Sequence, residues 1–450
     1  MAASTDAYSK TLLGSGVLYN DRRNFYIDPQ VVKELWTDVA PFTTVISNRE
    51  TRKVEDPLFK MFEHRNPWVK QKFAFNAGVA IPDPDTADGS AESAVIAVDG
   101  IENMESTADQ SWEGLIIEAW NAAETTRKAV LLCTEGDATG SPKFKALWTS
   151  DDGAYTTVDG DICHVVGNAH GEGETAPEAW SDELSVVWNS TQIFKTPLNI
   201  TGTLLEASLR GESSELARLR AQKNQEHKMQ KEKSFLYGVR GDTAAAGGTG
   251  LASGSSETFA DGGFTGAGGG KVRTTYGIVS ALNAYGAASG DDQSVYTISE
   301  ATYTYANFVD DMEKVFQYVP EAGVKRAFCG GGALGYWSKL AGTTGIAGTS
   351  GWTVNLSDMR RDSLGFNYKV LETPHGILQL IPTPALRGPN NKYMLVVSEE
   401  NLFHAQYRQP MFQANIKTDN AYDGVKDQYF SDEGLGITLI ESHNLFKITA

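Results

Sequence analysis

Two stretches of the sequence bring together residue types that bind metal ions. The stretch DPDTADG, from Asp83 to Gly89, resembles the start of a calcium-binding EF-hand loop. Such a loop needs acidic residues at positions 1, 3 and 5, glycine at position 6 and glutamate at position 12. Here the third acid falls one place late and position 12 is Ala94. We therefore expect a solvated acidic loop and no calcium site.

The second stretch contains Cys163, His164 and His170. Two adjacent ligands followed by a gap of six residues fit none of the common zinc spacings. We interpret the three as ordinary structural residues and expect no metal and no cofactor.

Catalytic motifs are incomplete. The glycine-rich stretch CGGGALGYWSK ends at Lys339, but a phosphate-binding loop needs glycine directly before its lysine, and Ser338 stands there. Close approach of the backbone to another element explains these glycines more simply. His375 has no serine, cysteine or aspartate placed with it, and no Gly-x-Ser-x-Gly motif occurs. We assign no catalytic residue and predict that the protein is not an enzyme.

The start of the chain lacks a basic segment followed by an apolar core, so we expect no secretory signal. No run of about 18 apolar residues is present, and we expect no membrane span. The three cysteines are widely spaced, and a chain of this size does not need disulfides. We therefore expect a soluble protein that is synthesised in a cytoplasm.

The net charge of −18 is concentrated in one region. Residues 81–190 hold 22 acidic and four basic residues, whereas the rest of the chain is formally neutral. Because buried carboxylates need partners, this contrast predicts a separate, solvent-exposed module. Short apolar runs bounded by Gly, Asp and Ser favour a small β-barrel or sandwich for it. Residues 206–240 carry a local charge of only +3, too little to indicate a nucleic-acid surface.

Outside this region the pattern predicts mixed helices and strands, an α+β protein. Residues 183–203 are rich in Val, Ile and Thr and favour a strand. We predict a helix over 299–319 with Ser299 as its N-cap, a hairpin over 366–382 that turns at Pro374–Gly376, and one buried strand over 392–407.

The segment from Leu204 to Gly238 predicts one long helix whose apolar stripe ends after Ala221. A helix that is polar nearly all round either has a solvated face or bridges other bodies. Either it is an ordinary solvated helix, or it is a strut that meets other chains. On the second interpretation the candidates for contact between subunits are Arg218, Arg220, Lys223, Glu226, Lys228, Lys231, Phe62 and Trp68.

Several stretches, in order, carry a resemblance to a known family: NSTQIF before the charged helix, EKSFLYG at its end, then ETPHGILQLIPTPAL, and DGVKDQYFSDEGLGITLIESHNLFKI near the C-terminus. The chain resembles the major capsid proteins of tailed bacteriophages, which have the Hong Kong 97-like fold. The resemblance covers nearly the whole chain, with the acidic module as the main departure.

The resemblance implies a set of domains. They are an N-terminal arm (1–50), an extended loop (51–203) with the acidic β-barrel-like insert (81–190), a spine helix of the peripheral domain (204–240), a Gly/Ser-rich loop (241–270), an axial domain (271–391) and return strands of the peripheral domain (392–450). In this family the extended loop lies over a neighbouring subunit, so the helix would lean on other chains.

The implied function is that of a structural protein that self-assembles into an icosahedral head. Hexamers and pentamers would enclose double-stranded DNA without sequence-specific binding, with portal and cement or decoration proteins as further partners. The protein would be located in the virion after assembly in the bacterial cytoplasm. The alternative is an acidic cell-surface or secreted protein whose β-module binds a ligand or calcium.

Overall fold

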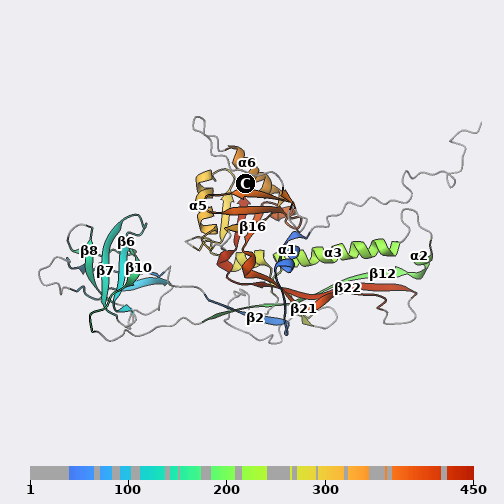
Figure 1. Ribbon diagram of the computed structural model, residues 1–450, viewed down its shortest axis with the longest axis horizontal. Helices are drawn as coiled ribbons and strands as arrows, with labels where there is room; N and C mark the ends of the chain where they lie inside the picture. Colours follow the sequence, from blue (N-terminus) through green and yellow to red (C-terminus); the bar gives the residue numbers. More distant parts are fainter. Residues whose placement is uncertain are drawn as a thin grey trace, which may run out of the picture. The chain divides into compact units, whose positions relative to one another are not determined.

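The computed structural model describes residues 40–64, 71–83, 92–102, 112–136, 142–150, 153–173, 184–207, 215–240, 264–265, 271–289, 292–318, 323–343, 360–361, 367–416 and 423–449 (Figure 1). The chain forms two compact units. The first, here the body unit, comprises Met1–Phe62 and Val186–Ala450, and the second, here the inserted unit, comprises Glu63–Ser185.

The inserted unit is built on a six-stranded antiparallel sheet with the strand order β5-β3-β10-β6-β7-β8. Its strands are β3 (Lys72–Phe75), β5 (Val98–Glu102), β6 (Leu115–Trp120), β7 (Arg127–Glu135), β8 (Lys143–Thr149) and β10 (Ile162–Asn168), and a short pair is formed by β4 (Ala80–Ile81) and β9 (Tyr155–Thr156). Alternate side chains point inward, as the period of two requires, and form a core around Phe73, Phe75 and Phe144.

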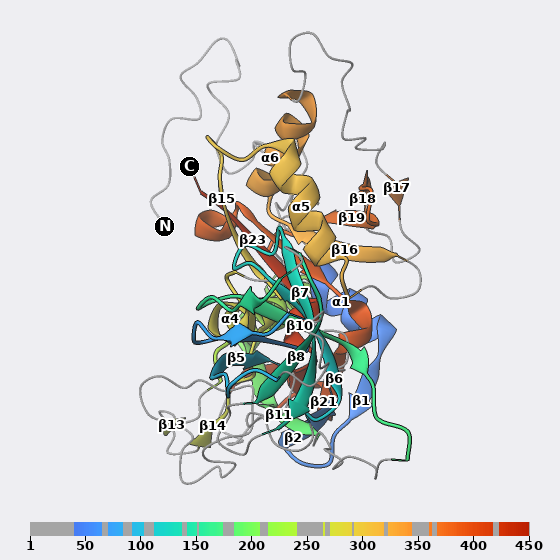
Figure 2. The same cartoon turned by 90° about the vertical axis from the view of Figure 1, so that its left-hand side faces the viewer.

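One stretch of chain connects the two edges of this sheet. The amides of Ser93 and Ile96 donate to the carbonyls of Phe144 and Pro142 beside β8. The same stretch continues into β5, which pairs with β3 at the other edge. The strands therefore curve around a common core, and Figure 2 shows them from the side.

Charge alone placed the boundary of the inserted unit incorrectly. The predicted module began at residue 81, but β3 lies inside the sheet, and the compact unit runs from Glu63 to Ser185. Because residues of β3 and its surroundings, such as Lys72, are basic, the charge pattern left β3 outside the predicted module. Lys72 forms an ion pair with Glu102 on β5 at 3.3 Å, so the unit has cations of its own.

Two strands flank the inserted unit and pair with each other, β2 (Leu58–Glu63) and β11 (Ser185–Ser190). The amide of Thr191 donates to the carbonyl of Pro57, and Ser185 Oγ donates to the carbonyl of Glu63. Because these two bonds join opposite ends of the strands, the pair is antiparallel. Residues 58–63 and 185–190 thus form a two-legged stem.

The body unit contains a four-stranded sheet, here the long sheet, with the order β1-β21-β22-β12. The strands are β1 (Thr51–Lys53), β12 (Gln192–Thr201), β21 (Leu402–Gln413) and β22 (Gly424–Ile437). β22 is antiparallel to both of its neighbours, and all ten residues of β12 are in register with it. The helix α3 lies along β12 and β22 (Figure 1).

The predicted long helix is two helices. α2 spans Gly202–Glu206 and α3 spans Glu215–Tyr237. Ala207 has extended backbone angles, φ −73° and ψ 130°, so a single helix over 204–240 is wrong. Residues 208–214, which belong to the predicted helix, lie outside the described residues.

A seven-stranded mixed sheet forms the rest of the body unit, with the order β15-β23-β20-β16-β19-β18-β17. Its strands are β15 (Val295–Ser299), β16 (Val324–Cys329), β17 (Arg360–Arg361), β18 (Asn367–Glu372), β19 (Ile377–Pro382), β20 (Tyr393–Val397) and β23 (Asn444–Thr449). The remaining elements are α1 (Pro41–Arg49), α4 (Ile278–Tyr285), α5 (Tyr305–Val315), α6 (Gly331–Thr343), the pair β13 (Phe264–Thr265) and β14 (Lys271–Val272), and three 3-10 turns, η5 (Gly388–Asn390), η6 (Glu399–Asn401) and η7 (Ile440–Ser442).

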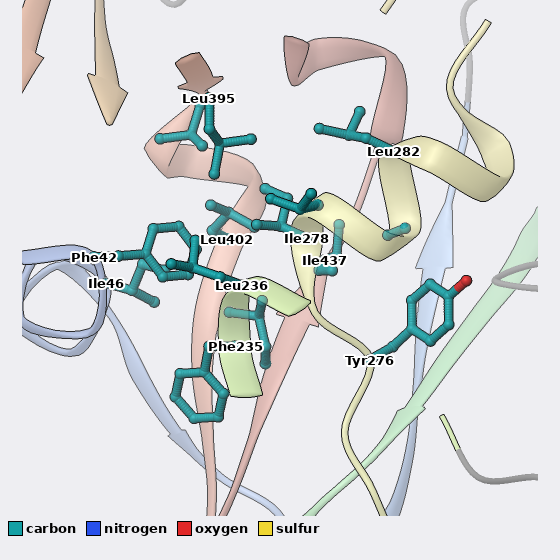
Figure 3. Packing of buried hydrophobic residues seen from close by; sticks show 14 of the residues in the cluster. Phe42, Ile46, Phe235, Leu236, Tyr276, Ile278, Leu282, Leu395, Leu402 and Ile437 are labelled. Atoms are coloured by element: carbon teal, nitrogen blue, oxygen red, sulfur yellow. The ribbon is translucent and has the colours of Figure 1, made fainter. Parts of the chain in front are cut away.

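Apolar residues cover both faces of the seven-stranded sheet. Along β20, Met394 and Val396 pack with α5 and α6, whereas Leu395 and Val397 belong to the opposite core. That opposite core also holds α1, α4 and the end of α3 (Figure 3). Phe235 is therefore buried at the point where α3 reaches the core.

Several predicted boundaries were wrong. The N-cap of α5 is Thr304, whose hydroxyl accepts from the amide of Asn307. Ser299 instead ends β15, opposite Thr449. The single strand predicted over 392–407 is split by η6 into β20 and β21, which lie in different sheets. The strands after residue 392 are thus shared between the two sheets, because β20 and β23 complete the seven-stranded one.

The predicted hairpin over 366–382 is confirmed. The hairpin of β18 and β19 turns at residues 373–376, where Thr373 and Gly376 exchange hydrogen bonds. In the predicted Gly/Ser-rich loop, residues 264–265 form β13, and residues 241–263 and 266–270 lie outside the described part.

Candidate assembly site

The polar middle of α3 is fixed to the long sheet by hydrogen bonds, beginning with His227. The amide nitrogen of Gln230 donates to Glu226, so its Oε1 faces Thr196 and accepts the Thr196 hydroxyl at 3.1 Å. The Thr196 oxygen must then accept from His227 Nδ1 at 3.0 Å. This leaves His227 Nε2 to accept from Ser431 Oγ at 3.0 Å. Burial and the nearby Lys231 lower the pKa of His227 to about 4, so its ring is neutral at pH 7.

Arg220 binds the carboxylate of Asp427, a residue of β22 whose side chain is fully buried. Arg220 Nε and Nη2 donate to Asp427 Oδ2 at 2.8 and 2.7 Å. The other oxygen accepts the amide of Asn415 at 2.8 Å. Both carboxylate oxygens are thus satisfied, as a buried charge requires. The guanidinium also lies 5.2 Å from the ring centre of Phe412.

Nearly two turns before the end of α3, Lys231 Nζ lies 3.1 Å from the buried carboxylate of Glu433. His404 Nε2 on β21 lies 3.3 Å from the same oxygen. Burial on its own would raise the pKa of Glu433, but His404 and Lys231 outweigh burial and hold the pKa below its usual value. The long sheet thus presents a charged carboxylate to the helix.

The neighbouring residue on β22, Asp432, points to the other face of the sheet, since successive side chains alternate. Its Oδ2 accepts from Arg273 at 3.2 Å and from Arg408 at 3.1 Å. The Arg408 guanidinium also lies 4.3 Å from the ring centre of Phe430. The two faces of β22 therefore each carry a buried carboxylate with cations from other elements.

Glu232 joins α3 to α1. Its carboxylate accepts from the amide of Phe42 at 3.0 Å, from the amide of Thr43 at 2.7 Å and from the Thr43 hydroxyl at 2.6 Å. The first turn of α1 has no acidic residue, and Ala40 at its N-cap gives no side-chain cap, so Glu232 supplies the negative charge that a helix N-terminus favours. Burial raises the pKa of Glu232, and the bonds from Thr43 and Phe42 oppose that rise.

These contacts show what the polar residues of the helix do. They face carboxylates and hydroxyls of the same chain, and Phe235 and Leu236 bury the apolar end. Breaking a buried ion pair by removing one partner costs on the order of 3–5 kcal/mol. The arrangement holds α1, α3 and the long sheet together, so the role of these side chains is structural.

Two of the predicted contact residues, Arg220 and Lys231, point into their own chain. Each binds a fully buried carboxylate of β22, at Asp427 and Glu433. Both side chains thus have partners within their own chain, and their contact with other chains stays a prediction. Their partners lie about 200 residues further along the sequence, and the periodicity of a helix cannot predict a pairing over that distance.

The other four predicted contact residues on α3 are Arg218, Lys223, Glu226 and Lys228. Arg218 forms an ion pair with Glu215 and Lys223 forms one with Glu226, each three residues apart on the helix. Such pairs add only about 0.2–0.5 kcal/mol. Lys228 is exposed.

The two aromatic candidates differ. The Phe62 side chain on β2 is 73% exposed, the largest exposed fraction among the large hydrophobic residues in the part of the chain that the structure describes. Trp68 lies outside the described residues.

Of the two stretches considered for metal binding, the structure describes Cys163, His164 and His170 in the second. Cys163 points into the core of the inserted unit, where burial raises its thiol pKa. His164 points outward, with Nε2 3.2 Å from Glu124. Residues 84–91 of the acidic loop lie outside the described part. No group of three metal-binding side chains occurs among the residues that the structure describes.

The glycine-rich stretch before α6 does approach another backbone, as expected. A Cβ on Gly330 would lie 2.2 Å from the carbonyl oxygen of Asn391. Lys339 and His375 are both exposed. Within the described residues, no helix is long and apolar enough to cross a membrane.

A family model described as SU10 major capsid protein matches residues 30–437. The chain belongs to this family. The resemblance to phage major capsid proteins is thereby confirmed, and the chain is a structural protein of a phage capsid shell. The matched range includes α1, α3 and the long sheet, so the contacts described above lie in the capsid subunit itself.

Several solved structures are similar to this chain. A capsid of a native GTA particle is 8% identical with a TM-score of 0.44, covering 98% of this chain and 100% of that one. Mycobacterium phage Patience is 12% identical with a TM-score of 0.38, covering 63% and 78%. The mature capsid of bacteriophage PhiM1 is 9% identical with a TM-score of 0.37, covering 64% and 79%. No curated protein matches the sequence.

Sequence reasoning missed Glu232, Asp427, Asp432 and Glu433. One signal was available. The stretch from Gly424 to Ile437 places three acids in a segment that otherwise favours a strand, and buried acids in a strand need cations from elsewhere. The long helix was the richest source of such cations.

Proposed function

We propose that copies of this chain close into an icosahedral head, as hexamers and pentamers, around double-stranded DNA. The family match over residues 30–437 carries the proposal. Repeated heterologous contacts between identical subunits form closed rings when the rotation closes. Each contact can be modest, since every subunit makes many of them.

We further propose that α3 and the long sheet form the peripheral domain. This proposal is supported by the rigidity of α3 on the long sheet, because a subunit that transmits force between its neighbours needs a stiff element. α3 is held along the long sheet by Arg220, His227 and Lys231, and to α1 by Glu232. The seven-stranded sheet with α5 and α6 would be the axial domain that gathers around five-fold and six-fold axes.

The inserted unit would face outward, away from DNA. Residues 63–185 contain 23 acidic and seven basic residues, a balance of −16. Like charge would keep heads apart on the outside and would repel phosphates on the inside. A cryo-EM map that places Glu63–Ser185 on the inner wall would contradict this.

Enclosure of DNA would need no base-specific contact, because a shell confines its contents by closure. A portal protein and cement or decoration proteins would be the further partners. Assembly would take place in the bacterial cytoplasm, and the finished protein would be located in the virion.

The test is expression of the full chain followed by negative-stain electron microscopy and sedimentation. We expect polyhedral particles, sheets or tubes. A monomer that stays solitary at every concentration, and that binds calcium or glycan through the inserted unit, would overturn the proposal and support a surface-binding protein.

A further inference from the structure

One edge of the seven-stranded sheet has no neighbouring strand among the described residues. β15 is the first strand of this sheet, with β23 on one side only (Figure 2). An edge strand presents unpaired amide and carbonyl groups, and these can pair with another extended chain. The outward side of β15 is therefore a place where a further strand can be added.

The hydrogen bonds between β15 and β23 show which residues face outward. The amide of Leu445 donates to the carbonyl of Ser294 at 2.7 Å, and the amide of Glu300 donates to the carbonyl of Thr449 at 3.0 Å. In a parallel pair, alternate residues of a strand bond to the same neighbour. The even-numbered residues of β15 thus face β23, and Thr297 at its centre faces away.

The outward side is occupied at both ends of the strand. At the start, the amide of Val295 donates to the carbonyl of Ala287 at 3.0 Å, and the carbonyl of Val295 accepts from Gln293 Nε2 at 3.3 Å. At the end, the carbonyl of Ser299 accepts from the amide of Tyr303 at 3.1 Å. The amide and carbonyl of the central residue and the amide of the last one bond to no described residue. The open part of the edge thus offers two amides and one carbonyl.

A cavity of about 390 Å³ lies beside this edge, lined by residues of β15, of α5 and of the turn between them. Its volume is in the range of about 300–1,000 Å³ that ligand sites have. The lining includes Tyr296, Tyr303, Asp310 and Asp311, and it includes no lysine or arginine. Tyr296 packs in the core that α5 covers, so the cavity is on the α5 face of the sheet.

The two carboxylates of the cavity favour a cation. Tyr303 Oη donates to Asp311 Oδ2 at 2.6 Å, which leaves Oδ1 to accept from another donor. Burial raises the pKa of Asp311, and the bond from Tyr303 and the charge of Lys314 only partly oppose that rise. The Lys314 ammonium donates to Gln293 Oε1 at 3.2 Å. A further cation at Asp311 and the exposed Asp310 would offset the solvation lost by burial.

We propose that the outer edge of β15 and the adjoining cavity dock an extended, basic segment of a partner protein. The segment adds a strand to β15 through the two amides and the carbonyl. Side chains of an added strand alternate between the two faces of the sheet, so one Arg or Lys lies on the α5 face and enters the cavity, where it meets Asp310 and Asp311. The inference goes beyond closure of a shell, since the occupant is a different chain.

The size of the site favours a peptide segment as the occupant. The open edge runs from Thr297 to Ser299, and one cavity adjoins it. Strand addition with a pocket for an alternate side chain is a recurring mode of peptide recognition. An interface between two folded subunits buries about 1,600 Å² in the standard case, far more than a three-residue edge supplies.

The first test measures binding of a synthetic peptide to the dispersed full chain by fluorescence anisotropy. The probe is a fluorescein-labelled peptide, Thr-Val-Arg-Val-Thr with a blocked C-terminus, and its control has Glu in place of Arg. The Arg peptide should bind at least about tenfold more tightly than the Glu peptide. Replacing both acids, Asp310→Asn with Asp311→Asn, should remove this preference. The matched control is Glu313→Gln, an exposed acid of α5 that does not line the cavity, and it should keep the preference.

The second test concerns the backbone of the edge. Thr297→Pro removes an outward amide and leaves the bonds to β23 in place, because proline is tolerated where an edge strand faces solvent. Binding of the Arg peptide should fall about tenfold or more at an unchanged melting temperature. If this variant does not fold, the Arg peptide methylated at its backbone nitrogens tests the same bonds on the unmodified chain and should bind equally weakly. Hydrogen–deuterium exchange of residues 295–299 should slow when the unmethylated peptide is added.

Three results would overturn the proposal. They are no binding of the Arg peptide, equal affinities for the Arg and Glu peptides, and exchange of residues 295–299 that the peptide leaves unchanged. Binding that is present in the dispersed chain and lost in assembled particles would also overturn it, because a neighbouring copy would then occupy the edge. The dispersed chain is sufficient for both tests, so their outcome is separate from the question of whether a shell forms.

Discussion

Replacing Glu232 by Gln tests whether a side chain of α3 holds α1 in place. The Glu232 carboxylate accepts three hydrogen bonds from the first turn of α1. Glutamine keeps one acceptor oxygen but puts an NH2 group at the other position, where Thr43 donates twice. Leaving a buried or part-buried donor without a partner costs about 1–3 kcal/mol. Because about 1.4 kcal/mol corresponds to a factor of ten, the population of locally opened α1 should rise about 5- to 150-fold.

Hydrogen–deuterium exchange measures this population directly. Amides of residues 41–49 should exchange faster in Glu232→Gln by that factor, because exchange under native conditions reports local opening. Amides of α4, residues 278–285, should change less, since they touch the same core without bonding to Glu232. The control is Lys233→Gln, at an exposed neighbouring position. If α1 exchanges equally in both variants, the carboxylate does not anchor it, and apolar packing of Phe42 alone would explain its position.

Three further predictions concern other buried charged or polar groups. The pKa of His227 is lowered from 6.5 to about 4 in the folded protein, so its contribution to stability is complete above pH 6.5 and is lost as pH falls through 4. The loss amounts to about 3 kcal/mol. His227→Gln should therefore reduce the difference between the amide exchange rates of α3 at pH 7 and at pH 4. Arg220→Ala should destabilise the contact of α3 with β22 by about 1–3 kcal/mol. This is less than the full cost of breaking a buried ion pair, because the Arg220 side chain is 36% exposed. In a double-mutant cycle, adding Asp427→Asn should recover part of the lost stability. Asp161→Asn should destabilise only the inserted unit, by about 2–4 kcal/mol, because the buried Asp161 carboxylate accepts from Lys128 Nζ at 2.7 Å through Oδ1, and from the Tyr155 hydroxyl at 2.6 Å and the Val158 amide at 3.1 Å through Oδ2. Exchange of residues 143–149 should rise while that of 424–437 stays constant, and the exposed Asp159→Asn is the control.

The sequence predicted features that local chemistry determines. The turn at Pro374–Gly376 joins β18 and β19 as expected, and the glycine at 330 approaches Asn391 as expected. The order of a stem, a polar helix, an α/β unit and returning strands is the one expected from the sequence, and the inserted unit interrupts the stem. Turns, glycines and element order are local or sequential properties, which explains why they were readable.

Non-local pairing limited the rest. Ser299 has a side chain suited to an N-cap, but β15 pairs with β23, and Ser299 lies opposite Thr449, which is 150 residues away. Ser299 is therefore part of a strand, and Thr304 caps the helix instead. β20 pairs with β16 and β23, whereas β21 pairs with β1 and β22, so the two strands belong to different sheets. Their sequence alone predicts a single apolar strand. Local propensity is a weak guide where tertiary contacts compete with it.

The polar character of α3 follows from the strand it lies on. Sheet alternation aims Asp427, Ser431 and Glu433 of β22 at one face, at intervals of two and four residues. A rise of about 3.3 Å per strand residue and 1.5 Å per helix residue makes six strand residues span about as far as 13 helix residues. Arg220 and Lys231 are 11 residues apart, close to that length, so cations on the helix match carboxylates on the strand. An apolar stripe at the same positions would have left those carboxylates buried without partners, which is why a helix with so little to bury is stable here.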